Sequence, residues 1–394
     1  MSRNILYLAP PSRSRNGIAD YADSYQETVE TCTDWRLRRI DDAHMVTGES
    51  LRDLFRVRNQ VKRWKTDGTL HGVDFIHAEI GYKQHDLFYR LFWLKYLLPS
   101  VPYCITVHDP PLVLAPALLP LSLGLKATSV RRACRILDYT PLGKGIVRSV
   151  LTRATDLFAL SHRGRDVLQA TLGPQASVSW LPFLNYRRTR PTKSLHQEAS
   201  PITILFSGFW GRGKGIEILL QAMETIQMRS PHAVRLWMTG GAESSASSQR
   251  YMASIKQRIQ ASPAKSIVDI LGYLPPDAID KTFDAAHIFA LPTITREGYA
   301  TSSVLFRALA AGLAIVASDV GMMGEEIRHQ DTGLLVPPGD ADALSDALLC
   351  LIKSPDLRAH VSQRAIDHAF TEHGQEAVAQ QAASYYNRIL ARQS

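Results

Sequence analysis

The feature that most constrains the fold is an alternation of short apolar runs with helix-length amphipathic segments, which occurs twice along the 394-residue chain. An apolar run followed by a helix predicts a buried strand of a parallel sheet, because helices then cover both faces of that sheet. The runs lie at 5–9, 73–78, 102–108, 154–160 and 178–182 in the first series, and at 202–207, 234–239, 267–271, 288–291 and 313–317 in the second. We therefore expect an α/β protein with two Rossmann-like parallel-sheet domains.

A polar segment between the two series, residues 185–200, marks the expected domain boundary. It lacks an apolar period and contains a proline, as interdomain linkers do. The sequence therefore predicts a first domain at 1–184 and a second at 201–374. The last helix, expected at 375–391, is long enough to cross back, so 375–394 is assigned to the first domain.

The net charge of +8 favours anionic partners such as phosphates, nucleic acid or an anionic membrane surface, and it also fits a basic protein without such a partner. Nucleic acid is disfavoured, because no interleaved aromatics or recognised module accompany the charge. The four cysteines show no C-x-x-C spacing, which predicts buried thiols in a reducing compartment and neither disulfides nor a metal site.

The apolar runs are too short for a secretory signal or a membrane span, since the longest, 112–125, has 14 residues and contains two prolines. A cytoplasmic protein is expected. Two segments also fit peripheral contact with an anionic membrane at its inner face. Residues 51–65 carry six basic side chains with Phe55, Val61 and Trp64, and the run 112–125 precedes a basic stretch. A solvated surface helix and a buried helix pair are the respective alternatives.

Residues that suit ligand binding follow several expected strands, where the ligands of a parallel sheet collect. The first run leads into a basic loop with Gly17 that lacks G-x-G-x-x-G, which disfavours a nicotinamide cofactor. The run 102–108 ends in His108 and Asp109. We expect His108 to be functional, with a structural histidine as the alternative.

The loop 208–215 contains four glycines together with Arg212 and Lys214, between an expected strand and an expected helix. Glycines let backbone N–H groups approach a phosphate, and the two cations would neutralise it. The P-loop pattern does not fit, because Gly215 follows Lys214. A plain tight turn is the alternative.

The stretch 293–319 places Arg296, Glu297 and Gly298 in a loop before an Ala-rich helix, which is expected at 302–311 and is followed by Gly312. A glycine in that place is typical of a helix C-terminus. The free N–H groups at the helix start suit an anionic or hydroxyl-rich ligand.

These motifs in this order resemble the retaining, sugar-nucleotide-dependent glycosyltransferases of the glycogen-synthase-like group (group 1). That family has the GT-B fold, in which two Rossmann-like domains face each other across a cleft. The resemblance is strongest over 202–350. Its segments are 16–21, 106–109, 206–215, 271–292, 311–321 with Glu325, and 332–340.

The resemblance implies three catalytic residues. His108 would face the donor sugar. Lys214, with Arg212, would hold the diphosphate and stabilise the leaving group. Glu297 would hydrogen-bond the sugar hydroxyls. The other donor-binding residues that it implies are Gly17, Gly208, Gly298, Tyr299, Ala300, Thr301, Ser302, Arg307 and Glu325.

The sequence departs from the family where a second glutamate, which binds the nucleotide ribose, should stand. Position 305 is Leu305, and alignment on the following Ala-Leu-Ala-Ala-Gly places Arg307 there instead. The hydroxyl of Ser302 or Ser303 is expected to take part of the role, and Arg307 to meet a phosphate or to pair with Glu325. The donor base, UDP or GDP, stays open.

The implied function is a retaining hexosyltransferase that needs neither a metal nor another cofactor. It would move a sugar from a nucleotide-diphosphate donor to a glycan or polyprenyl-linked acceptor, as in bacterial-type surface polysaccharide assembly. The alternatives are a non-catalytic GT-B homologue that binds glycan or scaffolds a biosynthetic complex, and a sugar-nucleotide epimerase.

Overall fold

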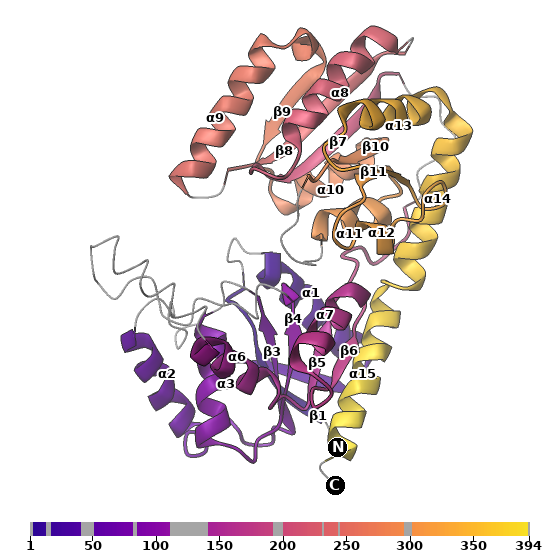
Figure 1. Cartoon of the computed structure of the whole chain (residues 1–394). Helices are drawn as coiled ribbons and strands as arrows, with labels where there is room; N and C mark the ends of the chain where they lie inside the picture. The colour runs from indigo at the N-terminus through magenta and orange to yellow at the C-terminus, as the bar shows by residue number, and fades with distance from the viewer. Residues whose placement is uncertain are drawn as a thin grey trace. The chain divides into compact units, whose positions relative to one another are not determined.

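The computed structural model describes residues 3–12, 17–40, 51–81, 85–110, 141–191, 200–230, 232–242, 245–294 and 302–392 (Figure 1). The chain divides into two compact units. The first comprises Met1–Leu184, Glu297–Thr301 and Gln375–Ser394, and the second comprises Asn185–Arg296 and Ser302–Gly374. The first residue of the expected linker, Asn185, is fully buried in the second unit.

In the part of the chain that the structure describes, the first unit is built on a sheet of six parallel strands in the order β2-β1-β3-β4-β5-β6. Its strands are β1 (Arg3–Leu8), β2 (Trp35–Arg39), β3 (Phe75–Ile80), β4 (Tyr103–Val107), β5 (Asp156–Ala159) and β6 (Val178–Trp180). The helices of its described residues are α1 (Gly17–Cys32), α2 (Leu51–Arg63), α3 (His85–Leu97), α6 (Pro141–Leu151), α7 (His162–Leu172) and α15 (Gln375–Ala391).

The C-terminal helix α15 packs on the first unit, as the sequence predicted. The Tyr386 hydroxyl lies 2.7 Å from the Tyr25 hydroxyl of α1. Tyr385 donates to the carbonyl of Trp180 at 2.7 Å, so α15 also contacts the last strand of the sheet. The helix α15 also buries an apolar face, so both polar and apolar contacts hold it in place.

Among its described residues, the second unit has its own sheet of six parallel strands, in the order β12-β11-β10-β7-β8-β9. Its strands are β7 (Ile202–Phe209), β8 (Val234–Gly241), β9 (Val268–Gly272), β10 (Ile288–Leu291), β11 (Ala314–Ser318) and β12 (Leu334–Val336). Its helices are α8 (Ile216–Arg229), α9 (Ala246–Ala261), a 3-10 helix (Pro263–Ile267), α10 (Pro276–Ala285), α11 (Ser303–Ala310), α12 (Met323–Glu326), α13 (Ala341–Lys353) and α14 (Pro355–Thr371). Two parallel sheets with helices confirm the expected fold class.

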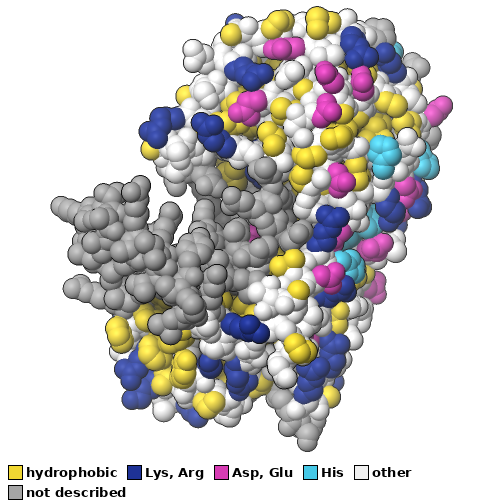
Figure 2. Space-filling model, viewed as in Figure 1, with side chains coloured by type: hydrophobic (Ala, Val, Ile, Leu, Met, Phe, Trp, Pro, Cys, Tyr) yellow, Lys and Arg dark blue, Asp and Glu magenta, His cyan; other side chains and the backbone are white. Residues whose placement is uncertain are grey.

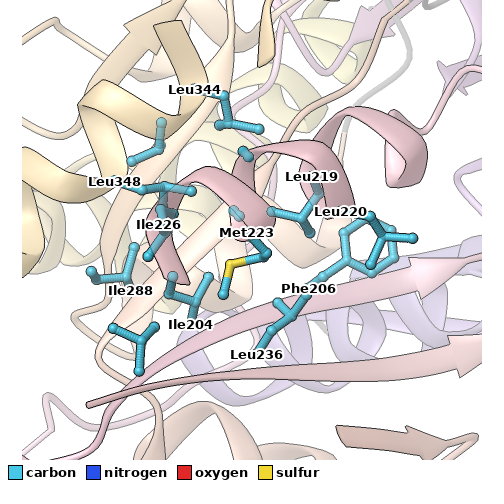
Figure 3. Close-up of a cluster of buried hydrophobic side chains, with 14 of the residues drawn as sticks. Ile204, Phe206, Leu219, Leu220, Met223, Ile226, Leu236, Ile288, Leu344 and Leu348 are labelled. Atoms are coloured by element: carbon cyan, nitrogen blue, oxygen red, sulfur yellow. The ribbon is translucent and has the colours of Figure 1, made fainter. Parts of the chain in front are cut away.

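The core of the second unit forms where α8 and α13 lie against the strands (Figure 3). Leu219, Met223 and Ile226 recur at helical spacing on α8 and are fully buried. Burying a side chain of this size contributes roughly 1.5–3 kcal/mol, so this face alone explains why the segment docks as a helix.

The strand order of the second sheet identifies where a ligand should bind. The chain runs outward from β7 to β8 and β9 on one side, and from β10 to β11 and β12 on the other. In a doubly wound sheet, ligands bind beyond the carboxyl ends of the strands at such a reversal. The loops that follow β7 and β10 are those that carry Lys214 and Glu297 in the sequence.

Candidate functional site

The glycine-rich loop after β7 is held to the sheet by Trp210, which is buried. Its backbone N–H donates to the carbonyl of Gly241 at 2.8 Å, and its indole Nε1 donates to the carbonyl of Thr239 at 3.3 Å. Both acceptors belong to β8. The loop therefore starts from a fixed point at the carboxyl ends of two neighbouring strands.

Gly215 joins this loop to the segment that follows β10. Its φ of +69° lies in the left-handed region, and a Cβ there would lie 1.7 Å from the carbonyl oxygen of Pro292. Next to this contact, the N–H of Ile294 donates to the carbonyl of Gly213 at 2.8 Å. The expected phosphate loop and the start of the loop that carries Glu297 are therefore in backbone contact, which only glycine at 215 permits.

The two cations expected at the diphosphate lie on the same loop. Lys214 is half-buried, and its N–H donates to the carbonyl of Gly211 at 3.2 Å. Arg212 is exposed, and its guanidinium carbon lies 5.8 Å from the ring centre of Tyr251. Both side chains therefore originate from the β7–α8 turn, and the guanidinium of Arg212 extends toward α9.

The helix behind the Glu297 loop, α11, begins after Ser302. Ser302 has little exposure, and its carbonyl accepts from the N–H groups of Leu305 and Phe306. Leu305 is fully buried, so its side chain packs in the core and does not replace the family's ribose-binding glutamate. Glu297, Gly298, Tyr299, Ala300 and Thr301 lie outside the described residues.

Arg307 has a different partner from the one expected. It forms an ion pair with Asp280 of α10, and its guanidinium lies over the ring of Tyr186. From the sequence, Glu325 or a phosphate is the expected partner. Because Asp280 neutralises this arginine, a phosphate-binding role for Arg307 loses its charge-based support. Glu325 lies on α12 and is half-buried.

In the first unit, His108 follows β4 and is held by a buried carboxylate. Its Nε2 lies 2.7 Å from Oε2 of Glu79, and the ring of Tyr21 meets the His108 ring edge-on at 5.0 Å. Burial alone would raise the pKa of Glu79, but hydrogen bonds and charge from His108, His77 and Tyr7 outweigh it and hold that pKa below its usual value. An ionised Glu79 accepts, so His108 donates through Nε2 and its Nδ1 is left for other contacts.

A hydrogen-bonded network continues from this pair to the C-terminal helix. Tyr7 donates to Oε1 of Glu79 at 2.7 Å. His77 contacts Thr106 Oγ1 through Nε2 and the Tyr386 hydroxyl through Nδ1, each at 2.7 Å. This network was not predicted from the sequence. Its signal was a polar pair, residues 77 and 79, on one face of a strand that is otherwise apolar.

Gly17 is the first residue of α1, and a Cβ there would meet no atom within 4 Å. The fold of the first unit therefore does not require glycine at this position. Gly208 differs, because its φ of +138° favours glycine. The ligand roles of Gly17 and Gly208 stay predictions.

Burial makes His77 a source of acid sensitivity, since it lowers the pKa of this histidine to about 4 from 6.5. As the pH falls, the unfolded chain binds a proton at this histidine before the folded chain does. The contribution of neutral His77 to stability is therefore fully present above pH 6.5 and is lost between pH 6.5 and about pH 4. We expect the His77 side chain to lower the free energy of unfolding by about 2 kcal/mol when the pH falls from 7.5 to 5. Urea unfolding at both pH values, on the wild type and His77→Gln, measures it.

The His77→Gln variant should be less stable at pH 7.5 but should lose less on acidification than the wild type. His71→Gln, at an exposed position between α2 and β3, is the control and should retain the wild-type difference. If the wild type and His77→Gln lost equal stability between pH 7.5 and pH 5, His77 would not be the source of the acid sensitivity.

Comparison with known proteins bears on the second half of the chain. The family model described as Glycosyl transferases group 1 matches residues 188–368. The D-inositol 3-phosphate glycosyltransferase of Corynebacterium aurimucosum is 28% identical over 256 residues, which are 61% of this chain and 59% of that protein. The chain thus spans about three fifths of the length of this relative.

Two further proteins extend the comparison. The GDP-mannose-dependent alpha-(1-6)-phosphatidylinositol monomannoside mannosyltransferase of Mycobacterium tuberculosis is 24% identical over 277 residues, which are 64% of this chain and 69% of that protein. The structure of Anabaena HepE in complex with UDP-glucose is similar in fold, with a TM-score of 0.67, 16% identity, and coverage of 98% of this chain and 99% of that one. Residues 188–368 are therefore similar to the group 1 glycosyltransferases, and the relatives that match this chain are glycosyltransferases by name.

Proposed function

We propose that this protein transfers a sugar from a nucleotide-diphosphate donor to a hydroxyl acceptor, with retention of anomeric configuration. The observation that carries the proposal is the backbone contact between Gly215 and Pro292, with the hydrogen bond from Ile294 to Gly213 beside it. It joins the expected phosphate loop to the start of the expected sugar loop at the reversal point of the second sheet, where nucleotides bind in related folds.

In the proposed reaction, the bond between the sugar's anomeric carbon and the diphosphate oxygen breaks. A bond from the acceptor oxygen forms on the same face of the sugar, and the acceptor proton passes to the leaving diphosphate. Lys214 and Arg212 would stabilise the negative charge that develops on the diphosphate. Glu297 would orient the sugar hydroxyls, and His108, fixed by Glu79, would contact the sugar. The step as proposed uses no metal and no other cofactor.

The proposed donors are UDP-hexoses and GDP-hexoses. HepE was solved with UDP-glucose, and the mycobacterial relative is named for GDP-mannose, so the comparisons support both bases. The buried Leu305 removes the family's ribose contact at that position, which leaves the hydroxyls of Ser302 and Ser303 as the proposed substitutes.

Incubation with UDP-glucose, UDP-galactose, UDP-N-acetylglucosamine and GDP-mannose tests the function. We expect one of them to raise the melting temperature and to release its nucleotide slowly to water. No shift and no release with any of the four would contradict donor binding. A shift without release, even when glycan and lipid-linked acceptors are added, would favour the non-catalytic homologue. Formation of an altered sugar nucleotide would favour the epimerase.

A lipid-linked acceptor at an anionic membrane is a further part of the proposal. It is supported by α2 and α3, over which hydrophobic and basic side chains lie side by side (Figure 2). Phe55 of α2 and Tyr96 of α3 are both 55% exposed. Among the described residues, none of the helices is long and apolar enough to span a bilayer.

The expected apolar face of α2 needs a correction. Val61 and Trp64 are buried in the core of the first unit, so they face inward and only Phe55 of the three is exposed. The basic side chains Arg56, Arg58 and Lys62 are exposed. The membrane proposal therefore rests on charge and on a few aromatic side chains.

Flotation with vesicles that contain phosphatidylglycerol tests the membrane proposal. Replacing Arg56, Arg58 and Lys62 with glutamate should abolish flotation, because each basic residue near an anionic surface contributes about 1 kcal/mol. The matched control reverses three exposed charges on α9, at Arg250, Lys256 and Arg258, and should float as the wild type does. The membrane proposal would be contradicted if the wild type did not float with the vesicles, or if both variants lost flotation equally.

A further inference from the structure

Three buried side chains that can bind a metal ion lie close together in the second unit. In the sequence they are more than 100 residues from the β7–α8 loop. They are Glu326, at the end of α12, His368, in the last turn of α14, and His373, just after that helix. One ligand atom from each lies within 4.8 Å of the other two. Their exposed fractions are 4%, 6% and 1%, so all three groups are withdrawn from solvent.

The distances within this cluster fit a shared cation. Nε2 of His368 and Nε2 of His373 each lie 3.0 Å from Oε2 of Glu326. Neighbouring ligands of a tetrahedral Zn²⁺ lie roughly 3.4 Å apart, given metal–ligand bonds of about 2.0–2.1 Å. Each imidazole nitrogen therefore needs to move away from Oε2 of Glu326 by only a few tenths of an ångström to share such an ion with it. Two imidazoles and one carboxylate are a donor set that zinc takes.

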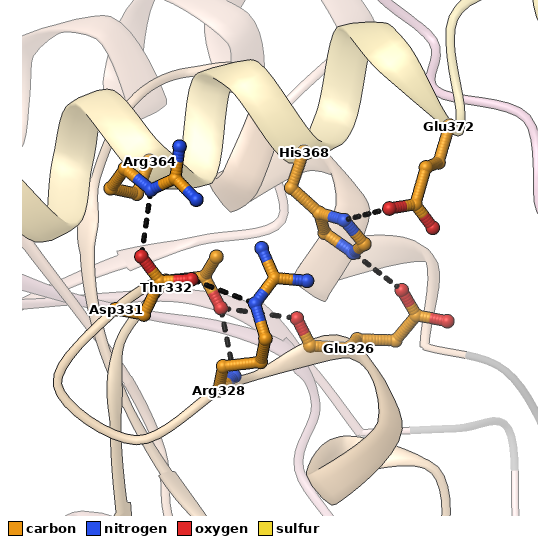
Figure 4. Close-up of polar contacts among 7 residues, drawn as sticks. All are labelled: Glu326, Arg328, Asp331, Thr332, Arg364, His368 and Glu372. Atoms are coloured by element: carbon orange, nitrogen blue, oxygen red, sulfur yellow. Dashed lines mark hydrogen bonds and ion pairs between the residues drawn. The ribbon is translucent and has the colours of Figure 1, made fainter.

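The residues around the two histidines resemble those that surround the ligands of metal sites. Oε1 of Glu372 lies 3.3 Å from Nδ1 of His368, on the side of the ring away from Glu326 (Figure 4). A carboxylate on the far nitrogen of a histidine orients the ring and strengthens it as a ligand. The ring of Phe306 lies against His373, with ring centres 4.6 Å apart, and limits the access of water on that side.

The backbone near the cluster is also fixed. Thr332 donates to the carbonyl of Glu326 at 3.3 Å. Asp331 pairs with both Arg328 and Arg364 at 2.7 Å, which ties the loop after α12 to α14 (Figure 4). The ligands therefore start from elements that are already connected, which lowers the cost of organising a site.

We propose that Glu326, His368 and His373 bind a divalent cation of the zinc type, which clamps α12 to the end of α14. The carbonyl of His373 accepts from the N–H of Asn185 at 2.9 Å, and the side chain of Asn185 donates to the carbonyl of Ala369 at 3.3 Å. Asn185 begins the second unit and Gly374 ends it. The cation thus stabilises the place where the chain enters and leaves this unit.

This site is separate from the transfer step, which is proposed to use no metal, and no metal was expected from the sequence. The sequence could not show the cluster, because Glu326 stands 42 residues before His368. Only the fold of the second unit brings the three ligands together.

The test uses the full chain, stripped with a chelator and then titrated with Zn²⁺ and with Co²⁺. We expect one tightly bound Zn²⁺ per chain, a rise in melting temperature with Zn²⁺, and the visible absorption of tetrahedral Co²⁺. His368→Gln should weaken Zn²⁺ binding by more than about 100-fold, because it removes one of three ligands. His360→Gln, at an exposed position on the same helix, is the control and should bind as the wild type does.

A second variant covers the case in which His368→Gln does not fold. Glu372 is 48% exposed, so Glu372→Gln should fold normally and weaken Zn²⁺ binding by about 10-fold through the orientation of His368. The proposal is overturned if the wild type binds no Zn²⁺ at micromolar concentrations. It is also overturned if His368→Gln or Glu372→Gln binds Zn²⁺ as tightly as His360→Gln, since the ion would then lie elsewhere.

Discussion

Gly215→Ala is expected to destabilise the second unit by about 2–4 kcal/mol and to abolish donor binding. Alanine at the φ of +69° costs about 1–2 kcal/mol, and its Cβ would lie 1.7 Å from the Pro292 carbonyl oxygen, so backbone must move as well. The movement would separate the proposed phosphate loop from the segment that holds Ile294. Urea unfolding and calorimetric titration with the donor measure the two effects.

The same loop offers a matched control. A Cβ at Gly211 would meet no atom within 4 Å, and this glycine does not have a positive φ. Gly211→Ala should therefore change the free energy of unfolding by less than about 1 kcal/mol. If the two variants were equally stable and bound donor equally, the close contact with Pro292 would not organise the site.

Glu297→Ala is expected to lower kcat by about 10²–10³-fold or more while the protein stays folded. The proposed reason is the loss of a charged acceptor for sugar hydroxyls, at which hydrogen bonds strengthen as positive charge develops on the sugar. The loop that carries Glu297 is fixed at its start by the hydrogen bond from Ile294 to Gly213. Initial rates of transfer and of donor hydrolysis, with circular dichroism as the folding check, measure this.

Asp346→Ala is the control for this variant, because Asp346 is an exposed residue on α13 that pairs with Arg229. It should leave kcat unchanged and lower stability by less than about 1 kcal/mol. Turnover by Glu297→Ala at the wild-type rate would remove Glu297 from the catalytic residues. An unfolded Glu297→Ala protein would assign the residue a structural role instead.

Most strands and helices could be predicted from the sequence, because apolar runs and helical periodicity are set by residues that are close together in the chain. The strand β2 was not predicted, since only Trp35 and Leu37 are buried in it and arginines alternate with them. A half-buried edge strand of this kind has too few apolar residues to be recognised by composition. The expected cleft between the two domains stays a prediction.

The contacts of individual side chains were not predictable in the same way. Asp280 and Arg307 belong to different helices, and the sequence offers no rule that pairs them. His77 contacts Tyr386, which lies 309 residues further along the chain. The glycines of 208–215 were recognisable, because a backbone with positive φ restricts the residue type locally.

A crystal structure of the protein with its donor tests most directly whether the second unit binds a nucleotide diphosphate at the carboxyl ends of β7 and β10. We predict the diphosphate within hydrogen-bonding distance of the backbone N–H groups of 211–215 and of the Lys214 ammonium, with the sugar beside Glu297. A diphosphate bound elsewhere, with no contact to Lys214 or to the loop 208–215, would contradict the proposed site.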